Sequence, residues 1–277
     1  MNNKRILVIA LLAFIAFEAV CQVRGARRRH YRAFHEGTTL VVKHGKPMSN
    51  FNERMKEEME RFWTVTPYEF ITFEEFQRIR TSDEYSFIIL AEIQQRDIPH
   101  IFKFMNFVLG DEERHFNRMP DLGSVPLAYR DSEEETYLYK LGAFVRFMNN
   151  YAAESGGSDH LGLTRFLNVR DSRVKEYELW LLEDELAPQI RTVEEIQKYY
   201  PYPVKIVTRE DIQEAIAQQR DDIAFLHKLG PARTVEEGGC WKFIITTEGE
   251  VLYSNDHQVQ RLEPDALLIS DLKRMAR

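Results

Sequence analysis

The sequence offers little thiol chemistry. Its two cysteines are Cys21 and Cys240. A dithiol redox site needs a second cysteine close by, usually two residues away, and a low-pKa thiolate at a helix N-terminus. Cys240 instead follows Gly238-Gly239 at the start of an apolar segment. We therefore expect a buried, unreactive thiol at Cys240.

Metal ligands are equally scattered. The eight histidines show neither HxH nor HExxH spacing, and they stand at positions 30, 35, 44, 100, 115, 160, 227 and 257. Asp159-His160 could donate two ligands, but a polar loop explains this pair better. Three acidic runs lack the alternation of a calcium loop and are interpreted as solvated surface. These runs are Asp111-Glu112-Glu113, Asp131 to Glu135, and Glu183-Asp184-Glu185. The sequence thus predicts no metal site.

Nucleophile and phosphate motifs are also missing from the sequence. It contains no GxSxG and no glycine-rich loop ending in Lys-Ser/Thr, and Ser155-Gly156-Gly157-Ser158 is too short to enclose a phosphate. Paired carboxylates for glycoside hydrolysis are recognised only by their separation in space. We therefore assign no catalytic, cofactor-binding or metal-binding residue and expect no cofactor.

The large aromatic residues favour a core rather than a binding groove. Trp63, Trp180 and Trp241 each fall on the apolar face of an expected helix or strand. The segment 101–109 is apolar at alternate and at intervening positions. Such a strand lies centrally in a sheet or against a second body.

Apolar periodicity predicts alternating strands and helices in the first half of the chain. Expected strands are 40–42, 68–71, 85–90 and 101–109, and expected helices are 51–63, a segment beginning after Thr72, and about 133–153. Thr72 with Glu75 has the spacing of a capping box. The same order returns later in the chain. Expected strands there are 179–182, 204–207, 223–226, 241–245 and 251–253, and expected helices are 192–200, a segment beginning after Thr208, and 265–275.

Several residues of the two halves match at nearly constant spacing. Thr72–Gln77 corresponds to Thr208–Gln213, Phe102-Lys103-Phe104 corresponds to Trp241-Lys242-Phe243, and Gly110 corresponds to Gly249. We therefore predict an α/β (α+β) protein with two tandem repeats of a β-α-β-α-β-β-α unit, each a mixed sheet covered by helices. The repeats span 37–154 and 174–277, with 155–173 as a linker.

The N-terminus has a different composition. Lys4 and Arg5 precede an apolar run, Ile6 to Phe17, that is shorter than the ~20 residues of a membrane span. We expect residues 1–21 to be a signal peptide, cleaved near Cys21. Residues 22–36 form a basic stretch, interpreted as a solvated tail or as a contact with an acidic surface.

The expected order of elements resembles two known α/β arrangements, the thioredoxin fold and the N-terminal domain of TolB. The run Trp63 to Thr72 and the export signal also resemble uncharacterised secreted proteins of Bacteroidota. This resemblance implies an exported protein and an α/β fold, and it implies no activity.

Composition narrows the classes of function. The chain is 44% hydrophobic with a net charge of −7, which argues against a nucleic-acid partner, and once the signal is cleaved no integral membrane protein is expected. We expect an exported, non-enzymatic binding or scaffolding component of the cell envelope, whose partner is an envelope protein or surface component. The alternative is a hydrolase or other enzyme with its site in the cleft between the repeats. A deep cleft that gathers His, Asp or Glu would favour the enzyme, and a flat patch would favour the scaffold.

Overall fold

The computed structural model describes residues 24–46, 48–94, 100–113, 118–154, 166, 168–231 and 238–277. It contains two five-stranded mixed sheets, which belong to a first unit (residues 24–154) and a second unit (residues 168–277). The expected signal peptide and the glycine-rich part of the expected linker, Ser155 to His160, lie outside the described residues.

The first sheet has the strand order β2-β1-β3-β4-β5. Strands β1, β2 and β3 are parallel, and β4 and β5 continue the sheet antiparallel. The strands are β1 (Thr38–Val42), β2 (Tyr68–Ile71), β3 (Tyr85–Gln94), β4 (Ile101–Leu109) and β5 (Val125–Tyr129). The helices are α2 (Arg28–Glu36), α3 (Phe51–Phe62), α4 (Phe73–Ile79) and α5 (Leu141–Glu154).

The second sheet repeats this topology with the order β10-β9-β8-β6-β7. Strand β6 is parallel to both β7 and β8, and β9 and β10 are antiparallel. The strands are β6 (Glu178–Leu181), β7 (Val204–Ile206), β8 (Ile223–Leu229), β9 (Gly239–Thr246) and β10 (Val251–Gln258). The helices are α6 (Val193–Gln197), α7 (Arg209–Ala217) and α8 (Ile269–Met275). The predicted α/β class and its two similar units are thus confirmed.

The matched caps hold in both units. Thr72 accepts a hydrogen bond from the backbone of Glu75, and Thr208 accepts one from the backbone of Asp211. Each carboxylate in turn accepts a hydrogen bond from the backbone N–H of the cap threonine, so each helix begins with a complete capping box.

The matches in the later strands are displaced. When the two sheets are compared, the position of β3 that pairs with Leu109 is equivalent to the position of β8 that pairs with Thr246. Leu109 therefore corresponds to Thr246, and Lys103, earlier in the same strand, corresponds to Cys240. The Lys103/Lys242 match is therefore wrong by two residues. A step of two keeps every side chain on the same face of the strand, which is why the pattern looked right.

The match between Gly110 and Gly249 is also wrong. Gly249 has a φ of +85° in the turn between β9 and β10. Gly110 instead packs against the backbone of Ser82, where a Cβ would lie 1.8 Å from the carbonyl oxygen. The two glycines thus meet different backbone requirements.

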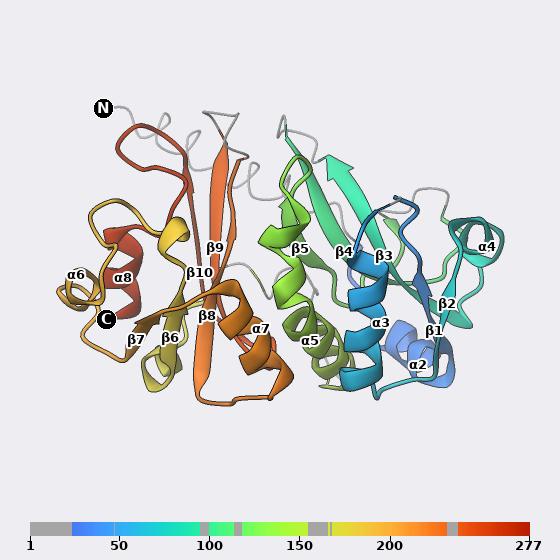
Figure 1. Cartoon of the computed structure of the whole chain (residues 1–277). Coiled ribbons are helices and arrows are strands. Elements are labelled where there is room, and N and C mark those ends of the chain that lie inside the picture. The colour runs from blue at the N-terminus through green and yellow to red at the C-terminus, as the bar shows by residue number, and fades with distance from the viewer. Residues whose placement is uncertain are drawn as a thin grey trace, which may run out of the picture.

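A single hydrophobic core joins the units. It contains one face of each sheet together with α2, α3, α5 and α7. Helix α5 lies between the sheets beside α7 (Figure 1). Phe144 of α5 packs on His227 of β8, with ring centroids 4.8 Å apart. The first unit turns its α3 and α5 face inward and the second turns its α7 face inward, so the outer faces carry α4 on one side and α6 and α8 on the other.

Three predicted segments need correction. The helix expected over 133–153 begins only at Leu141, because two 3₁₀ turns, η2 (Glu134–Thr136) and η3 (Leu138–Lys140), precede it. The C-terminal helix starts at Ile269 rather than at Asp265. In the expected tail, residues 28–36 form α2, whose Tyr31 and Phe34 are buried in the shared core while its arginines face solvent. The solvated-tail interpretation is therefore wrong for the described residues.

Candidate ligand site between the two units

The candidate site lies beyond the carboxyl ends of the parallel strands of the second sheet. Asp184 and Glu185 follow β6, Arg209 follows β7, and Lys228–Pro231 end β8. The chain crosses from β6 to β7 in one direction and returns past β6 to β8, so the strand order reverses between β6 and β8. Ligands of open α/β sheets bind at such a switch point, because the loops diverge there and leave a crevice.

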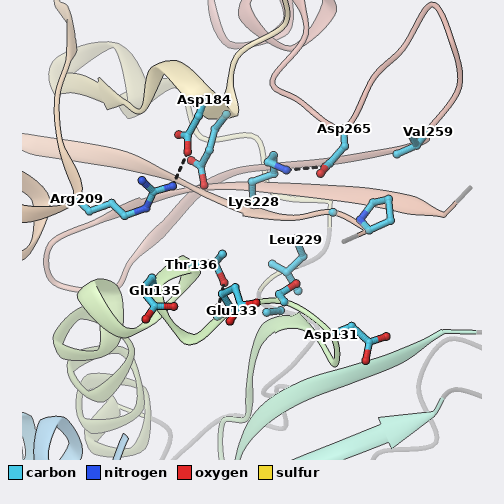
Figure 2. A pocket seen from close by; sticks show the side chains of 15 residues that line it. Asp131, Glu133, Glu135, Thr136, Asp184, Arg209, Lys228, Leu229, Val259 and Asp265 are labelled. Atoms are coloured by element: carbon cyan, nitrogen blue, oxygen red, sulfur yellow. Dashed lines mark hydrogen bonds and ion pairs between the residues drawn. The ribbon is translucent and has the colours of Figure 1, made fainter. Parts of the chain in front are cut away.

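The crevice is a cavity of about 940 Å³ with walls from both units. Figure 2 shows the first-unit wall facing Asp184, Arg209, Lys228 and Asp265 of the second unit. The first-unit wall follows β5 and consists of Ala128, Asp131, Ser132, Glu133, Glu135 and Thr136. Segments far apart in the sequence thus form one site.

The second-unit wall is built from ion pairs. Arg209 contacts Asp184 at 2.6 Å, and Lys228 contacts Asp265 at 2.6 Å. Burial lowers the pKa of Lys228, but the attractions of Asp265, Cys240 and Glu185 together outweigh it and leave this pKa above its ordinary value. Both cations therefore stay charged and remain bound to carboxylates of the same wall.

A third pair joins the units and includes Glu185 of the cavity wall. Lys140 of η3 is fully buried, and its Nζ lies 3.7 Å from Oε1 of Glu185. At that distance neither Nζ nor the other oxygen of Glu185, Oε2, has a hydrogen-bond partner among the described residues. Burial raises the pKa of Glu185 and lowers that of Lys140, and their mutual attraction opposes both shifts.

Two further buried polar atoms adjoin this pair. The Tyr139 hydroxyl and Nε of Arg209 have no hydrogen-bond partner among the described residues. The Lys140 ammonium lies 4.8 Å from the centre of the Tyr139 ring. Buried polar atoms are normally satisfied by protein, water or ligand, so this group indicates room for an additional polar partner.

The equivalent end of the first sheet is occupied by the protein itself. Glu134 of η2 accepts hydrogen bonds from Oγ of Ser49, at 2.8 Å, and from the backbone N–H of Asn50, at 3.3 Å. Its carboxylate thus occupies the N-terminus of α3, where the helix dipole favours a negative charge. Lys103 donates to the carbonyl of Ser132 at 2.7 Å and holds the same segment. The segment 131–136 therefore closes the strand end of one unit while it forms a wall of the cleft in the other.

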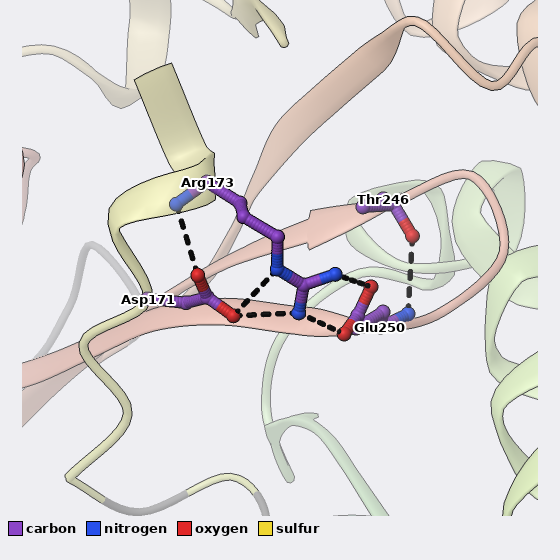
Figure 3. A network of polar contacts seen from close by, with 4 residues as sticks. All are labelled: Asp171, Arg173, Thr246 and Glu250. Carbon is purple, nitrogen blue, oxygen red and sulfur yellow. Dashed lines mark hydrogen bonds and ion pairs between the residues drawn. The ribbon is translucent and has the colours of Figure 1, made fainter. Parts of the chain in front are cut away.

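A smaller cavity of about 400 Å³ lies beside the turn between β9 and β10. Near it, Arg173 contacts Asp171 at 2.6 Å and Glu250 at 2.5 Å, and the Glu250 N–H donates to Thr246 (Figure 3). These exposed pairs fasten the start of the second unit to its hairpin. We interpret this network as structural.

No protein-family model, curated protein or solved structure matches this chain. Among the residues that the structure describes, no helix is both long and apolar enough to span a bilayer. Within the same residues no three His, Cys, Asp or Glu side chains are grouped closely enough to share a metal ion. The resemblance to thioredoxin, to TolB and to secreted proteins of Bacteroidota stays a prediction.

The expected burial of Cys240 in β9 is confirmed, and burial raises the pKa of its thiol. Trp63 and Trp180 are buried as expected, and Trp241 is partly buried against Phe102 of β4, with ring centroids 4.9 Å apart. The strand predicted to be apolar on both faces, 101–109, is thus interior to its sheet and also packs on the second unit. Asp159-His160 lies outside the described residues.

The runs 131–135 and 183–184 are largely exposed, as the solvated-surface interpretation predicted, but Glu185 is buried. The site was not predicted, because only the fold shows that the runs 131–135 and 183–185 face each other across the cleft. The available signal was their position, since 183–185 directly follows an apolar strand.

Proposed function

We propose that this protein is an exported, non-enzymatic binding protein that holds a small polar ligand in the cleft between its units. The observation that carries the proposal is Oε2 of Glu185, a buried acceptor without a hydrogen-bond partner among the described residues, in the wall of a cavity of about 940 Å³. Cavities of this size are typical of small-molecule sites. The switch-point position of the cleft supports the same function.

A filled-cleft variant tests the proposal. Ser132→Trp places an indole in the cleft, and Ser270→Trp places one on the exposed side of α8 as a matched control. In a thermal-shift screen of amines, amino acids, sugars and organic acids, a ligand should raise the Tm of the wild type and Ser270→Trp but not of Ser132→Trp. The proposal is wrong if no class stabilises the protein, or if Ser132→Trp responds like the control.

Hydrolysis is the second candidate function, and the gathering of Asp and Glu side chains in the cleft is the feature that favours it. Burial raises the pKa of Glu185, as a general acid requires, and Glu133 and Glu135 lie on the opposite wall. Turnover of a glycoside that Glu185→Gln abolishes and Ser270→Trp preserves would favour the enzyme over the binding protein.

The exported location is inferred from residues 1–21, and it gives the protein an envelope component as its partner or ligand source. N-terminal sequencing of the protein recovered from the native envelope tests the location. A mature chain that starts near residue 22 is expected, and a chain that starts at Met1 would contradict it.

A further inference from the structure

We propose that the ligand of the cleft is an extended organic polyamine, a molecule with two or more separated ammonium groups. The inference rests on the proposed function and adds the chemical class of the ligand. It follows from the charges of the walls, their pairing and their separation.

The walls of the cleft carry more negative than positive charge. Among the lining residues that the structure describes, the carboxylates come from both units, whereas the cations, Arg209 and Lys228, come from the second unit. The carboxylates are Asp131, Glu133, Glu135, Asp184, Glu185 and Asp265. In a cleft, such an excess concentrates cations and repels anions.

The positive groups of the cleft are each paired with a carboxylate, although Nε of Arg209 and Nζ of Lys140 make no hydrogen bond among the described residues. Arg209 and Lys228 are each 2.6 Å from a carboxylate of their own wall, and buried Lys140 is beside Glu185. An anionic ligand would have to break one of these pairs and leave a carboxylate uncompensated in a partly buried site, which is costly. A cation bound to the exposed carboxylates leaves these pairs in place.

Glu185 gives the cleft a specific attachment point. Its Oε2 is buried without a hydrogen-bond partner among the described residues, and the residue is only 8% exposed. An ammonium group has three N–H donors and no acceptor, so it can satisfy this oxygen and still donate to a neighbouring carboxylate. A charge-assisted hydrogen bond of this kind is roughly twice as strong as a neutral one.

The remaining carboxylates lie on the other wall. Glu133 and Glu135 belong to the first unit and are exposed, and they face the second unit across the cavity (Figure 2). In the described residues no three such groups converge on a point, as the short bonds of a metal ion would require. The charges therefore fit a ligand whose own positive charges are spread along a chain.

The experiment is calorimetric titration of the full-length protein with spermidine at low ionic strength. Glu133→Gln/Glu135→Gln removes two exposed charges from the far wall, and Glu60→Gln/Glu74→Gln removes two exposed charges from α3 and α4 as a control of equal net charge. We expect spermidine binding to weaken about 10-fold or more in the first variant and to stay within about 2-fold in the control. Glu185→Gln should weaken it further, with folding checked by circular dichroism.

Two further probes separate this inference from the proposed function. Triethylene glycol is uncharged and tricarballylate is anionic, both are similar to spermidine in size, and neither should bind measurably. The polyamine inference is overturned if spermidine does not bind and one of these probes does. Loss of that probe's binding in Ser132→Trp would show that the cleft is nevertheless a binding site. Equal spermidine affinity in Glu133→Gln/Glu135→Gln and in the control would also overturn it.

Discussion

At the scale of single residues, the Lys140–Glu185 pair is the most consequential feature. It buries two opposite charges between the units at 3.7 Å, with polar atoms of both groups left without hydrogen bonds among the described residues. A buried pair of this geometry contributes little net stability, because desolvation offsets the attraction. Its retention is better explained by the cleft above it, where a ligand can complete the contacts of Glu185.

The effects of substituting Lys140 and Glu185 on the free energy of unfolding should be strongly coupled. Lys140→Met should lower the free energy of unfolding by about 3 kcal/mol, because it removes the cation that acts most strongly on the buried Glu185 and leaves only the weaker effects of Lys228 and Arg209 among the described residues. Lys140→Met/Glu185→Leu should recover most of that loss, since neither charge of this buried pair remains. Urea unfolding of the four proteins in this mutant cycle measures the coupling, and additive single effects would contradict it.

The pH dependence of this cycle has a defined sign. Without Lys140 the pKa of Glu185 rises further above its ordinary value of 4.5, so the folded variant takes up a proton more readily than the unfolded chain. The penalty of Lys140→Met should therefore shrink as the pH falls from 7 toward 4.5. A penalty that grew on acidification would contradict the assignment.

At the scale of elements, capping boxes define corresponding helices in the two units. Helix α4 begins at Thr72 on an outer face, and α7 begins at Thr208 against the shared core. Helix starts depend on side chains within four residues, so a sequence pattern identifies them well. The segment 133–140 follows less local rules. It forms two 3₁₀ turns, in which Glu134 contacts the start of α3 and Lys140 contacts Glu185.

The caps give a prediction at this scale. Thr72→Ala and Thr208→Ala should each destabilise the protein by about 1 kcal/mol, because each leaves a helix N–H without its acceptor. Thr72→Ser and Thr208→Ser keep that acceptor and should cost much less. Chemical unfolding measures all four variants, and alanine variants as stable as the serine variants would contradict the capping role.

At the scale of the whole molecule, the two units behave as one folding body. The shared core contains aromatic side chains of both sheets, and α5 of the first unit packs directly on β8 of the second. Each unit alone would expose that face to water. The arrangement also fixes the walls of the cleft relative to each other, so a ligand meets a preformed site.

We therefore expect one cooperative unfolding transition. Variants that keep only Trp63 or only Trp180 report on the first and second unit respectively, and their fluorescence midpoints in urea should coincide. Phe144→Ala should lower the free energy of unfolding by about 3 kcal/mol or more, and both midpoints should fall together. Phe73→Ala, at a half-exposed site, should change the free energy of unfolding only slightly. Separate midpoints for the two tryptophans would show independent units.

The sequence by itself determined most elements, both capping boxes and the duplication, because these depend on apolar periodicity and on contacts over a few residues. It also correctly indicated a strand apolar on both faces at 101–109. Only the tertiary structure decided the exact register of the later strands, since a shift of two residues preserves every face. It alone brought the acidic runs 131–135 and 183–185 to opposite walls of one cleft. Separation in space between residues far apart in the chain has no local signature, and for that reason the candidate site appeared only with the fold.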